Sequence, residues 1–540
     1  MRIGVSQINP VLGDFEFNAD KILKEVHRAR ERRCDLVVFP ESAIFGYHPF
    51  DLLERPELVA RQEKAFAKLH RSLPKDIGVV LGLIVRNPAK KGRPFFNAAA
   101  VIEKGRKPII FHKQLLPTGD VFDEARFIET GDLSKNVFRF RGKKFFLTIC
   151  EDIWAWPDGK GRSDYRENPL AKVKEKKVDF IINLSASPFY PGKDKVRRQL
   201  VRQTAKHLNA PMLYCNLVGA QDEIVFDGGS FILDPKGKSL LRCQSFQEDF
   251  GFYDLESKEG SIRYDGPTGI EQIRQAMVLG LRDFCRKSGF SKVHLGLSGG
   301  IDSAVVAAVA VDALGPANVR CFYLPTEFSA AESGEASRQL AKNLGIELQE
   351  ISIQGMFEKV RGELDRALGI DKFGLPHENL QSRLRGMALM FYSNSSSSML
   401  LGTSNKSELA TGYSTLYGDL CAGFLPLGDL TKGQVFALAE HYNREYELIP
   451  RFIIDRPPSA ELRPNQKDQD SLPPYEQLDN SVEHLVQNSG KIRNDTDAWL
   501  LKALFRSEFK RWQAPPILKL SKHAFGRGRR FPVAHRSPLA

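Results

Sequence analysis

The sequence predicts an α/β fold class with two domains, and three observations support this prediction. In the first half of the 540-residue chain, short apolar runs suited to strands alternate with segments of helical spacing. Further on, a glycine pair at 299–300 separates an apolar run from an Ala- and Val-rich segment, as expected for a strand, a turn and a helix. A chain of this length is too long for one core, so we expect domains at 1–260 and 261–540.

The first half delivers reactive side chains at the ends of expected strands. These strands are placed at 3–8, 35–40, 79–85, 98–102, 145–149 and 179–184. One amphipathic helix is expected at 18–33, and a polar stretch at 241–264 is expected to link the two domains. Glu41, Lys113 and Cys150 stand at three strand ends, where α/β enzymes commonly hold their active groups, so we predict that they share one site.

A glutamate, a lysine and a cysteine together suit the hydrolysis of an amide. A cysteine attacks as its thiolate and therefore needs a base, and a carboxylate can take that proton and pass it to the departing ammonia. A lysine stabilises the oxyanion of the tetrahedral intermediate. Taken singly, each residue has another explanation, because a cysteine after a strand commonly packs in a core and a lysine or glutamate commonly faces solvent.

The segments around these three residues carry a family resemblance. Phe39–Tyr47, Phe111–Pro117 and Thr148–Trp154 are similar to motifs of the nitrilase superfamily. The resemblance implies a nitrilase-like α-β-β-α sandwich for the first domain. It also implies that the glutamate, lysine and cysteine act together as a catalytic triad.

One branch of that superfamily fits the first half closely. Residues 39–55 resemble the glutaminase domain of the glutamine-dependent NAD⁺ synthetases. This resemblance implies glutamine-binding residues, namely Gly119, Glu124, Ser187 and Lys193. Among them, Glu124 corresponds to a second, supporting glutamate. Gly119 stands where the family often has a tyrosine, so a backbone group would make that contact here.

The turn at 298–300 has the features of an anion-binding loop. Backbone N–H groups at the start of a helix point toward a ligand, and the helix dipole favours negative charge. Gly299 and Gly300 allow the backbone to approach a phosphate closely. The loop lacks the terminal Gly-Lys-Ser/Thr of a Walker A loop. The alternative is a glycine-rich turn that binds no ligand.

Ser298–Ser303 resembles the pyrophosphate loop of ATP pyrophosphatases, which cut ATP between its α and β phosphates. The resemblance implies ATP as a co-substrate. The implied ATP-binding residues are Gly296, Leu297, Ser298, Gly299, Gly300, Ile301, Asp302, Ser303 and Thr403. Asp302 and Glu408 would share Mg²⁺, because two carboxylates with phosphate oxygens and water make an ordinary magnesium site.

The remainder of the second half alternates strands and helices. Strands are expected at 320–324, 347–353 and 399–401, and helices at 268–287, 304–314 and 333–344. This succession predicts a doubly wound, Rossmann-like parallel sheet for the ATP pyrophosphatase domain. The serine-rich stretch 393–398 is expected to be a loop before the last strand.

Several further segments resemble NAD synthetase motifs. These are Glu378–Gly386, Gly402–Glu408, Gly412–Asp419 and Glu508–Pro516, with 458–470 similar to a mobile acidic loop of the family. The resemblance implies four residues for deamido-NAD⁺, namely Asn379, Glu408, Asp419 and Lys510. The alternatives are a solvated helix face for the first segment and a generic basic run or an RNA contact for the C-terminal one.

Composition limits the classes of partner and compartment. The net charge of +12 and the pI near 9.2 suit nucleic acid, and equally a polyanionic small molecule such as ATP. The seven cysteines include no CxxC pair, so we expect neither zinc nor a disulfide framework, and a cytoplasmic location. We find no signal-peptide pattern and no apolar run long enough to cross a membrane. We expect small-molecule substrates and a homo-oligomer, without a nucleic acid or membrane partner.

The resemblance to glutamine-dependent NAD⁺ synthetases covers essentially the whole chain. It implies that the first domain hydrolyses glutamine and that the ammonia amidates adenylated deamido-NAD⁺ in the second, while ATP gives AMP and pyrophosphate. Three alternatives stay open at this point. They are another ATP-dependent glutamine amidotransferase, an RNA-modifying ATP pyrophosphatase, and a metabolite-sensing protein built on inactive enzyme domains.

Overall fold

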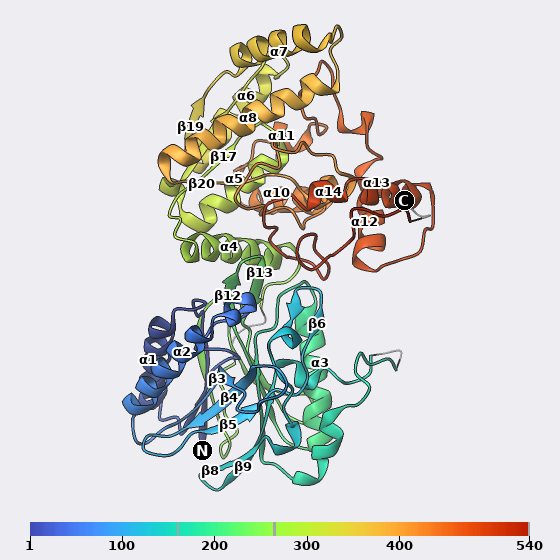
Figure 1. Cartoon of the computed structure of the whole chain (residues 1–540). Coiled ribbons are helices and arrows are strands. Elements are labelled where there is room, and N and C mark those ends of the chain that lie inside the picture. Colours follow the sequence, from blue (N-terminus) through green and yellow to red (C-terminus); the bar gives the residue numbers. More distant parts are fainter. Residues whose placement is uncertain (159–160, 263–265, 538–540) are drawn as a thin grey trace. The chain divides into compact units, whose positions relative to one another are not determined.

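The computed structural model describes residues 1–158, 161–262 and 266–537. The chain forms two compact units, one of Met1–Gln221 with Val225–Pro267 and one of Asp222–Ile224 with Thr268–Ala540 (Figure 1). The functional boundary near residue 260 stays a prediction.

The first unit contains two six-stranded sheets (Figure 1). One sheet has the order β16 (Asp249–Asp254), β1 (Arg2–Gln7), β2 (Leu36–Val38), β3 (Gly78–Arg86), β4 (Phe95–Ile102), β5 (Ile109–His112). The other has the order β15 (Ser239–Arg242), β14 (Phe231–Leu233), β11 (Met212–Asn216), β10 (Phe180–Ser185), β9 (Lys143–Ile149), β8 (Val137–Phe140). Two further pairs are β6 (Thr118–Gly119) with β7 (Phe122–Asp123), and β12 (Val218–Gln221) with β13 (Ile224–Asp227).

The central strands of the first unit, β1–β4 and β9–β11, are buried on both faces over most of their length, which explains their nearly continuous apolar sequences. In β2, Leu36 and Val38 join Phe145 of β9 in the core between the two sheets. Val37 points the opposite way and packs with Ile22 of α1 (Phe15–Glu31). Helix α2 (Pro56–Ser72) joins α1 on that outer face, and α3 (Lys193–Leu208) covers the outer face of the other sheet. The expected α-β-β-α sandwich is therefore confirmed.

The stretch expected to be a linker is part of this sandwich, so that prediction was wrong for residues 241–254. Strand β16 pairs antiparallel with β1, and β15 pairs with β14. The sequence is polar on average, but Leu241, Cys243 and Tyr253 are buried in the core between the sheets. Burial of these alternate side chains outweighs the polar composition of the segment. Tyr264, at the end of the expected linker, lies outside the described residues.

The second unit is built on a doubly wound sheet of four parallel strands. Its order is β19 (Glu347–Glu350), β18 (Val319–Tyr323), β17 (Val293–Gly296), β20 (Met399–Leu400). The chain proceeds outward from β17 to β18 and β19, and then returns to the other side of β17 for β20. The strand order therefore reverses between β17 and β20, which is where open α/β sheets bind their ligands.

Helices surround this sheet and follow one another along the chain as far as Arg511. Their bounds are α4 (Gly269–Lys287), α5 (Ile301–Leu314), α6 (Ala331–Leu344), α7 (Gln354–Leu368), α8 (Leu375–Ser396), α9 (Lys406–Thr411), α10 (Lys432–Tyr442), α11 (Arg451–Asp455), α12 (Tyr475–Val482), α13 (Asp495–Arg506) and α14 (Glu508–Arg511). Among the described helices, none combines the length and the apolar character needed to cross a bilayer.

The serine-rich stretch 393–398 was predicted wrongly as a loop, because α8 continues through Ser396. The side chains of Ser395 and Ser396 donate hydrogen bonds to the carbonyl oxygen of Tyr392 at 2.9 and 2.7 Å. Serines that bond back to the preceding turn are compatible with a helix, although their composition resembles that of a linker. Strand β19 is also shorter than expected, ending at Glu350.

Candidate functional site

A buried polar network lies in the first unit and contains two of the three predicted catalytic residues in direct contact. The Lys113 ammonium donates to Glu41 Oε1 and to Glu124 Oε1, both at 2.8 Å. Glu41, Lys113 and Glu124 are at most 2% exposed. Asn97 donates to the same two carboxylates, at 2.8 Å to Glu41 and 3.3 Å to Glu124. Buried charges at such sites are stable only when they are paired in this way.

Strand ends bring these groups together. Glu41 follows β2, and its second oxygen accepts the backbone N–H of Ala186, which follows β10. Lys113 follows β5, and its backbone N–H donates to the carbonyl of Asn97 on the neighbouring β4. Cys150 follows β9 and opens a short 3₁₀ helix, with a left-handed φ of 42° that is unusual for a cysteine.

The pKa shifts of Cys150, Glu41 and Lys113 favour a protonated thiol and a charged lysine. Burial raises the pKa of the Cys150 thiol well above its ordinary value; the charge of Glu41 raises it further, and that of Lys113 lowers it. Burial also raises the pKa of Glu41, against the charge of Lys113. For Lys113, burial lowers the pKa, but the charges of Glu124 and Glu41 outweigh burial and hold it well above its ordinary value. Lys113 therefore stays a cation that is hydrogen-bonded to two carboxylates and whose charge lowers the pKa of the Cys150 thiol.

A buried carboxylate that the sequence did not single out ties the lysine segment to the cysteine segment. Asp152 Oδ1 accepts the backbone N–H groups of Gln114 and Leu115, both at 2.9 Å, directly after Lys113. Its Oδ2 accepts the N–H of Ile149 at 2.9 Å, directly before Cys150. Burial raises the pKa of Asp152 to about 7, although these N–H groups lower it. Asp152 lies inside the cysteine motif, so that motif was the available signal. Asn97 had no sequence signal, because its contacts cross between strands.

The residues predicted to bind glutamine occupy several elements. Glu124 belongs to the network above, and the Tyr47 hydroxyl donates to it at 2.7 Å. Ser187 is buried in the loop after β10, whereas Lys193 begins α3 and places its ammonium 4.4 Å from the ring centre of Trp154. Gly119 is exposed in the β6–β7 hairpin with a left-handed φ of 109°, which favours glycine.

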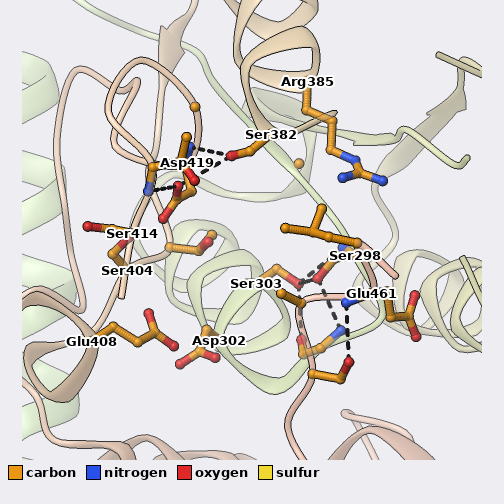
Figure 2. Close-up of a pocket in the computed structure, with 18 of the residues that line it drawn as sticks. Ser298, Asp302, Ser303, Ser382, Arg385, Ser404, Glu408, Ser414, Asp419 and Glu461 are labelled. Carbon is orange, nitrogen blue, oxygen red and sulfur yellow. Dashed lines mark hydrogen bonds between the residues drawn. The ribbon is translucent and has the colours of Figure 1, made fainter. Parts of the chain in front are cut away.

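The second unit holds a pocket of about 710 Å³ at the point where the strand order of its sheet reverses. The anion loop after β17 lines one side, and Gly402 and Thr403 after β20 line another. Ser298, Asp302 and Ser303 face the cavity in Figure 2. Of the predicted ATP-binding residues, Gly299 alone does not line the pocket as described; it turns with a φ of 76° against α6.

Two carboxylates in this pocket share one lysine. Lys432 Nζ donates to Asp302 Oδ2 at 2.5 Å and lies 3.5 Å from Glu408 Oε1. Figure 2 shows Asp302 and Glu408 on the same side of the cavity. Burial raises the pKa of Glu408 to about 8, and the charge of Asp302 adds to this rise. An additional cation would stabilise the pair, so this donor set fits Mg²⁺ completed by phosphate and water. Among the described residues, no group of three His, Cys, Asp or Glu side chains is arranged to hold a metal alone.

The residues predicted for deamido-NAD⁺ line the same pocket. Asn379 accepts a hydrogen bond from the Thr415 hydroxyl at 2.7 Å, and Asp419 accepts the Thr415 N–H at 2.6 Å. The Lys510 ammonium donates to the carbonyls of Gly412 and Ser414 at 2.7 and 2.6 Å. Asn379 on α8, Asp419 in a loop and Lys510 on α14 are thus brought to one cavity from distant parts of the sequence.

Sequence reasoning did not assign several charged side chains that line the pocket, among them Lys432, Arg385 and Glu461. Arg385 extends into the cavity in Figure 2, and its Nε donates to the carbonyl of Leu324 at 3.0 Å. Glu461, from the stretch expected to be an acidic loop, accepts hydrogen bonds from Ser333 Oγ at 2.7 Å and Arg456 at 2.6 Å. Arg385 and Glu461 lie within segments that resemble family motifs, which was the available signal for them, whereas Lys432 lies outside those segments.

Comparisons with known proteins agree with this two-part architecture. A carbon-nitrogen hydrolase family model matches residues 2–264, and an NAD synthase model matches residues 273–513. The glutamine-dependent NAD(+) synthetase of Synechocystis sp. is 41% identical, with 98% of each chain covered. That of Aquifex aeolicus is 36% identical, with 99% of each chain covered.

Solved structures show the same relationship. A glutamine-dependent NAD⁺ synthetase from Acinetobacter baumannii, in complex with ADP, is 33% identical and superposes with a TM-score of 0.78 over 98% of each chain. The corresponding enzyme of Cytophaga hutchinsonii is 20% identical with a TM-score of 0.83, covering 99% of this chain and 97% of that one, which supports the fold alone. Similarity at this identity over almost the whole length shows that the chain belongs to the glutamine-dependent NAD(+) synthetase family.

Proposed function

We propose that this protein synthesises NAD⁺ from deamido-NAD⁺, with ATP as co-substrate and glutamine as the nitrogen donor. The observation that carries the proposal is the presence of two chemically distinct sites on one chain. One is a buried cysteine with a carboxylate and a lysine, and the other is an anion loop in a large polar cavity. An RNA-modifying ATP pyrophosphatase would leave the buried cysteine site unexplained, whereas NAD⁺ synthesis from glutamine uses both sites. Another glutamine amidotransferase would also use both sites, and it differs in having no activity with deamido-NAD⁺.

In the first unit, Cys150 is the proposed nucleophile. Its sulfur attacks the side-chain amide carbon of glutamine while Glu41 takes the thiol proton, and Lys113 stabilises the negative oxygen that forms. The carbon–nitrogen bond then breaks, the proton on Glu41 goes to the nitrogen, and ammonia leaves. Water, activated by Glu41, hydrolyses the remaining thioester and releases glutamate. Ser187 and Lys193 would hold the amino-acid end of the substrate, with Glu124 supporting Lys113.

In the second unit, the nicotinate carboxylate of deamido-NAD⁺ is proposed to attack the α-phosphorus of ATP. The bond between the α and β phosphates breaks, and pyrophosphate leaves. Ammonia then attacks the activated carbonyl carbon, which expels AMP and leaves NAD⁺. The loop at 298–303 and Thr403 would bind ATP, while Asn379, Glu408, Asp419 and Lys510 would bind the dinucleotide. Asp302 and Glu408 would hold Mg²⁺, which when bound neutralises charge on the phosphates.

The purified wild-type protein is expected to form NAD⁺ from deamido-NAD⁺, ATP and glutamine, with one AMP and one pyrophosphate released per NAD⁺. The measurement is chromatographic separation of the nucleotides together with glutamate determination. Glutamine hydrolysis without consumption of deamido-NAD⁺ would instead favour another amidotransferase. Tight, salt-sensitive binding of tRNA without NAD⁺ formation would favour the RNA-modifying alternative. Absence of both activities would favour a sensing protein.

We also propose that the protein is a homo-oligomer and that it works in the cytoplasm. Helix α8 exposes Met387 and Phe391, which are 55% and 77% exposed and lie four residues apart on one helix face. Large apolar side chains gathered on one surface are typical of interfaces. The seven cysteines are unpaired thiols, six of them buried, which suits a reducing compartment.

Phe391→Asp is therefore expected to lower the molar mass in solution by half or more, because a buried carboxylate would be left unpaired in the interface. Light scattering coupled to size-exclusion chromatography measures this. Tyr446→Asp changes a similarly exposed ring, 64% exposed, outside α8 and is expected to leave the mass unchanged. An unchanged mass for Phe391→Asp would reject α8 as the interface.

A further inference from the structure

A fully buried arginine lies directly beneath the loop that carries Ser187. Arg197 projects from α3, one helical turn after Lys193. Its NH1 donates to both oxygens of Asp227 at 2.7 and 2.8 Å. Its NH2 donates to the carbonyls of Ser187 and Pro188 at 2.8 and 3.0 Å, and its Nε donates to Ser187 Oγ at 3.1 Å. Every donating edge of the guanidinium is therefore used within the described residues.

Such an arrangement contributes little to stability by itself. Removing two charges from water costs about as much as their attraction returns, so a buried ion pair is weak evidence for a stabilising role. What the guanidinium does supply is geometry, because its planar fork fixes several acceptors at once. Here, Asp227 orients the guanidinium of Arg197, and the guanidinium binds the loop that carries Ser187.

The loop is also held on its other side. The backbone N–H of Ser187 donates to Asn216 Oδ1 at 3.0 Å, and the Asn216 amide donates to the carbonyl of Gly228 at 3.1 Å. The backbone N–H and carbonyl of Ser187 are thus both bound. The hydroxyl is the remaining polar group of Ser187. The direction of its O–H bond decides which atom of a ligand it can bind.

Arg197 decides that direction. Because its Nε donates to Ser187 Oγ, one lone pair of the hydroxyl is occupied and the hydroxyl proton points elsewhere. The nearby Tyr214 hydroxyl makes no hydrogen bond of ordinary geometry among the described residues, although the neighbouring hydroxyls of Ser185 and Ser187 lower its pKa against the rise that burial causes. Ser187 is therefore prepared to donate to an acceptor on a ligand, and Lys193 places a cation on the first turn of the same helix.

We propose that Arg197 is a positioning residue that presents the Ser187 hydroxyl as a hydrogen-bond donor to the α-carboxylate of the glutamine substrate. This inference rests on the proposed function, which assigns Ser187 and Lys193 to glutamine. A donor hydroxyl with a cation nearby suits an anionic oxygen and does not suit an amine. Arg197 thereby sets specificity for an amino-acid amide over a simple amide and does not touch the substrate itself.

The test compares glutamine with 4-aminobutanamide, which has the same amide and lacks the α-carboxylate. Arg197→Lys keeps the charge beside Asp227 but loses the fork, so the kcat/KM ratio of glutamine to the truncated amide is expected to fall roughly 10- to 100-fold. The fall arises from a higher KM for glutamine and not from kcat. Arg198→Lys changes the neighbouring arginine of the same helix, which pairs with Asp194, and serves as the matched control.

A double-mutant cycle separates positioning from general stability. If Arg197 acts through Ser187, then Arg197→Lys adds no further rise in KM once Ser187→Ala is present. Independent effects that multiply, or an equal loss of kcat on both substrates, would overturn the proposal. Should Arg197→Lys fail to fold, Asp227→Asn releases the fork instead and is expected to show the same KM change. A wild-type protein that hydrolyses no glutamine would refute the proposed function, which is a different outcome.

Discussion

Cys150→Ala is expected to abolish NAD⁺ formation from glutamine, by more than about 10⁴-fold, while NAD⁺ formation from added ammonium continues. The alanine side chain cannot form the thioester, and Cys150 is a thiol whose pKa the charges of both Glu41 and Lys113 change. Ammonia added in solution replaces the product of the first unit, so the second unit retains its substrates. Separate rates with glutamine and with ammonium chloride, at saturating ATP, measure this.

The control for this variant is another buried cysteine. Cys34 and Cys150 are both 5% exposed, but Cys34 packs in the helix-covered core of the first sheet. Cys34→Ala is expected to keep glutamine-driven synthesis within a few-fold of wild type, since it removes only one small apolar contact. Glutamine-driven synthesis that survives in Cys150→Ala would contradict the proposed nucleophile. Loss of the ammonium-driven reaction as well would show that the variant damages the whole chain.

Gly299→Ala is expected to lower NAD⁺ synthesis by more than about 100-fold with either nitrogen source, because it displaces the anion loop. Gly299 has a φ of 76°, which residues with a side chain rarely adopt. A Cβ atom there would also lie 2.6 Å from the backbone oxygen of Ser333 at the start of α6, so the backbone itself must shift. The loop would then no longer present its N–H groups to the phosphates of ATP.

The adjacent glycine gives a matched comparison. Gly300 has an ordinary φ of −94°, and a Cβ atom there would meet only the Ser298 hydroxyl, at 3.2 Å. Gly300→Ala is therefore expected to retain a rate of NAD⁺ synthesis at least about tenfold higher than that of Gly299→Ala. The measurement is pyrophosphate release dependent on deamido-NAD⁺. Equal losses in the two variants would mean that the anion loop does not depend on its left-handed residue. Glutamine hydrolysis, which uses the first unit, provides a check that Gly299→Ala still folds.

The strands and helices that the sequence did predict have their signals in consecutive residues. The strand expected at 79–85 is observed as Gly78–Arg86, and the helix expected at 268–287 as Gly269–Lys287. The failures occurred where composition and burial disagreed. The polar segment at 241–254 contains β16, which contributes Tyr253 to a core assembled from both sheets. Composition cannot show that such a segment will pair with β1, where Tyr253 lies opposite Ile3 at the other end of the unit's sequence.

The same distinction applies to the two candidate sites, where features of consecutive residues were predictable and contacts between remote segments were not. The anion loop was recognisable because its strand, turn and helix follow one another along the chain. Their local geometry alone directs the backbone N–H groups at the helix start toward a ligand. The residues Glu41, Lys113 and Cys150 were found only through their separate motifs. The contacts that organise them were not visible: Asn97 bridges Glu41 and Glu124 from an adjacent strand, and Asp152 joins the segments of Lys113 and Cys150.

The sequence by itself determined the α/β class, the nucleotide loop and the identity of the groups that carry the chemistry, because these depend on side-chain type and on neighbours along the chain. Only the tertiary structure decided which lysine hydrogen-bonds which carboxylate, how far burial raises the pKa of the Cys150 thiol, and that Arg197 lies beneath Ser187. Hydrogen-bond direction and desolvation depend on distances between segments remote in the chain, and those distances exist only once the sheets have packed.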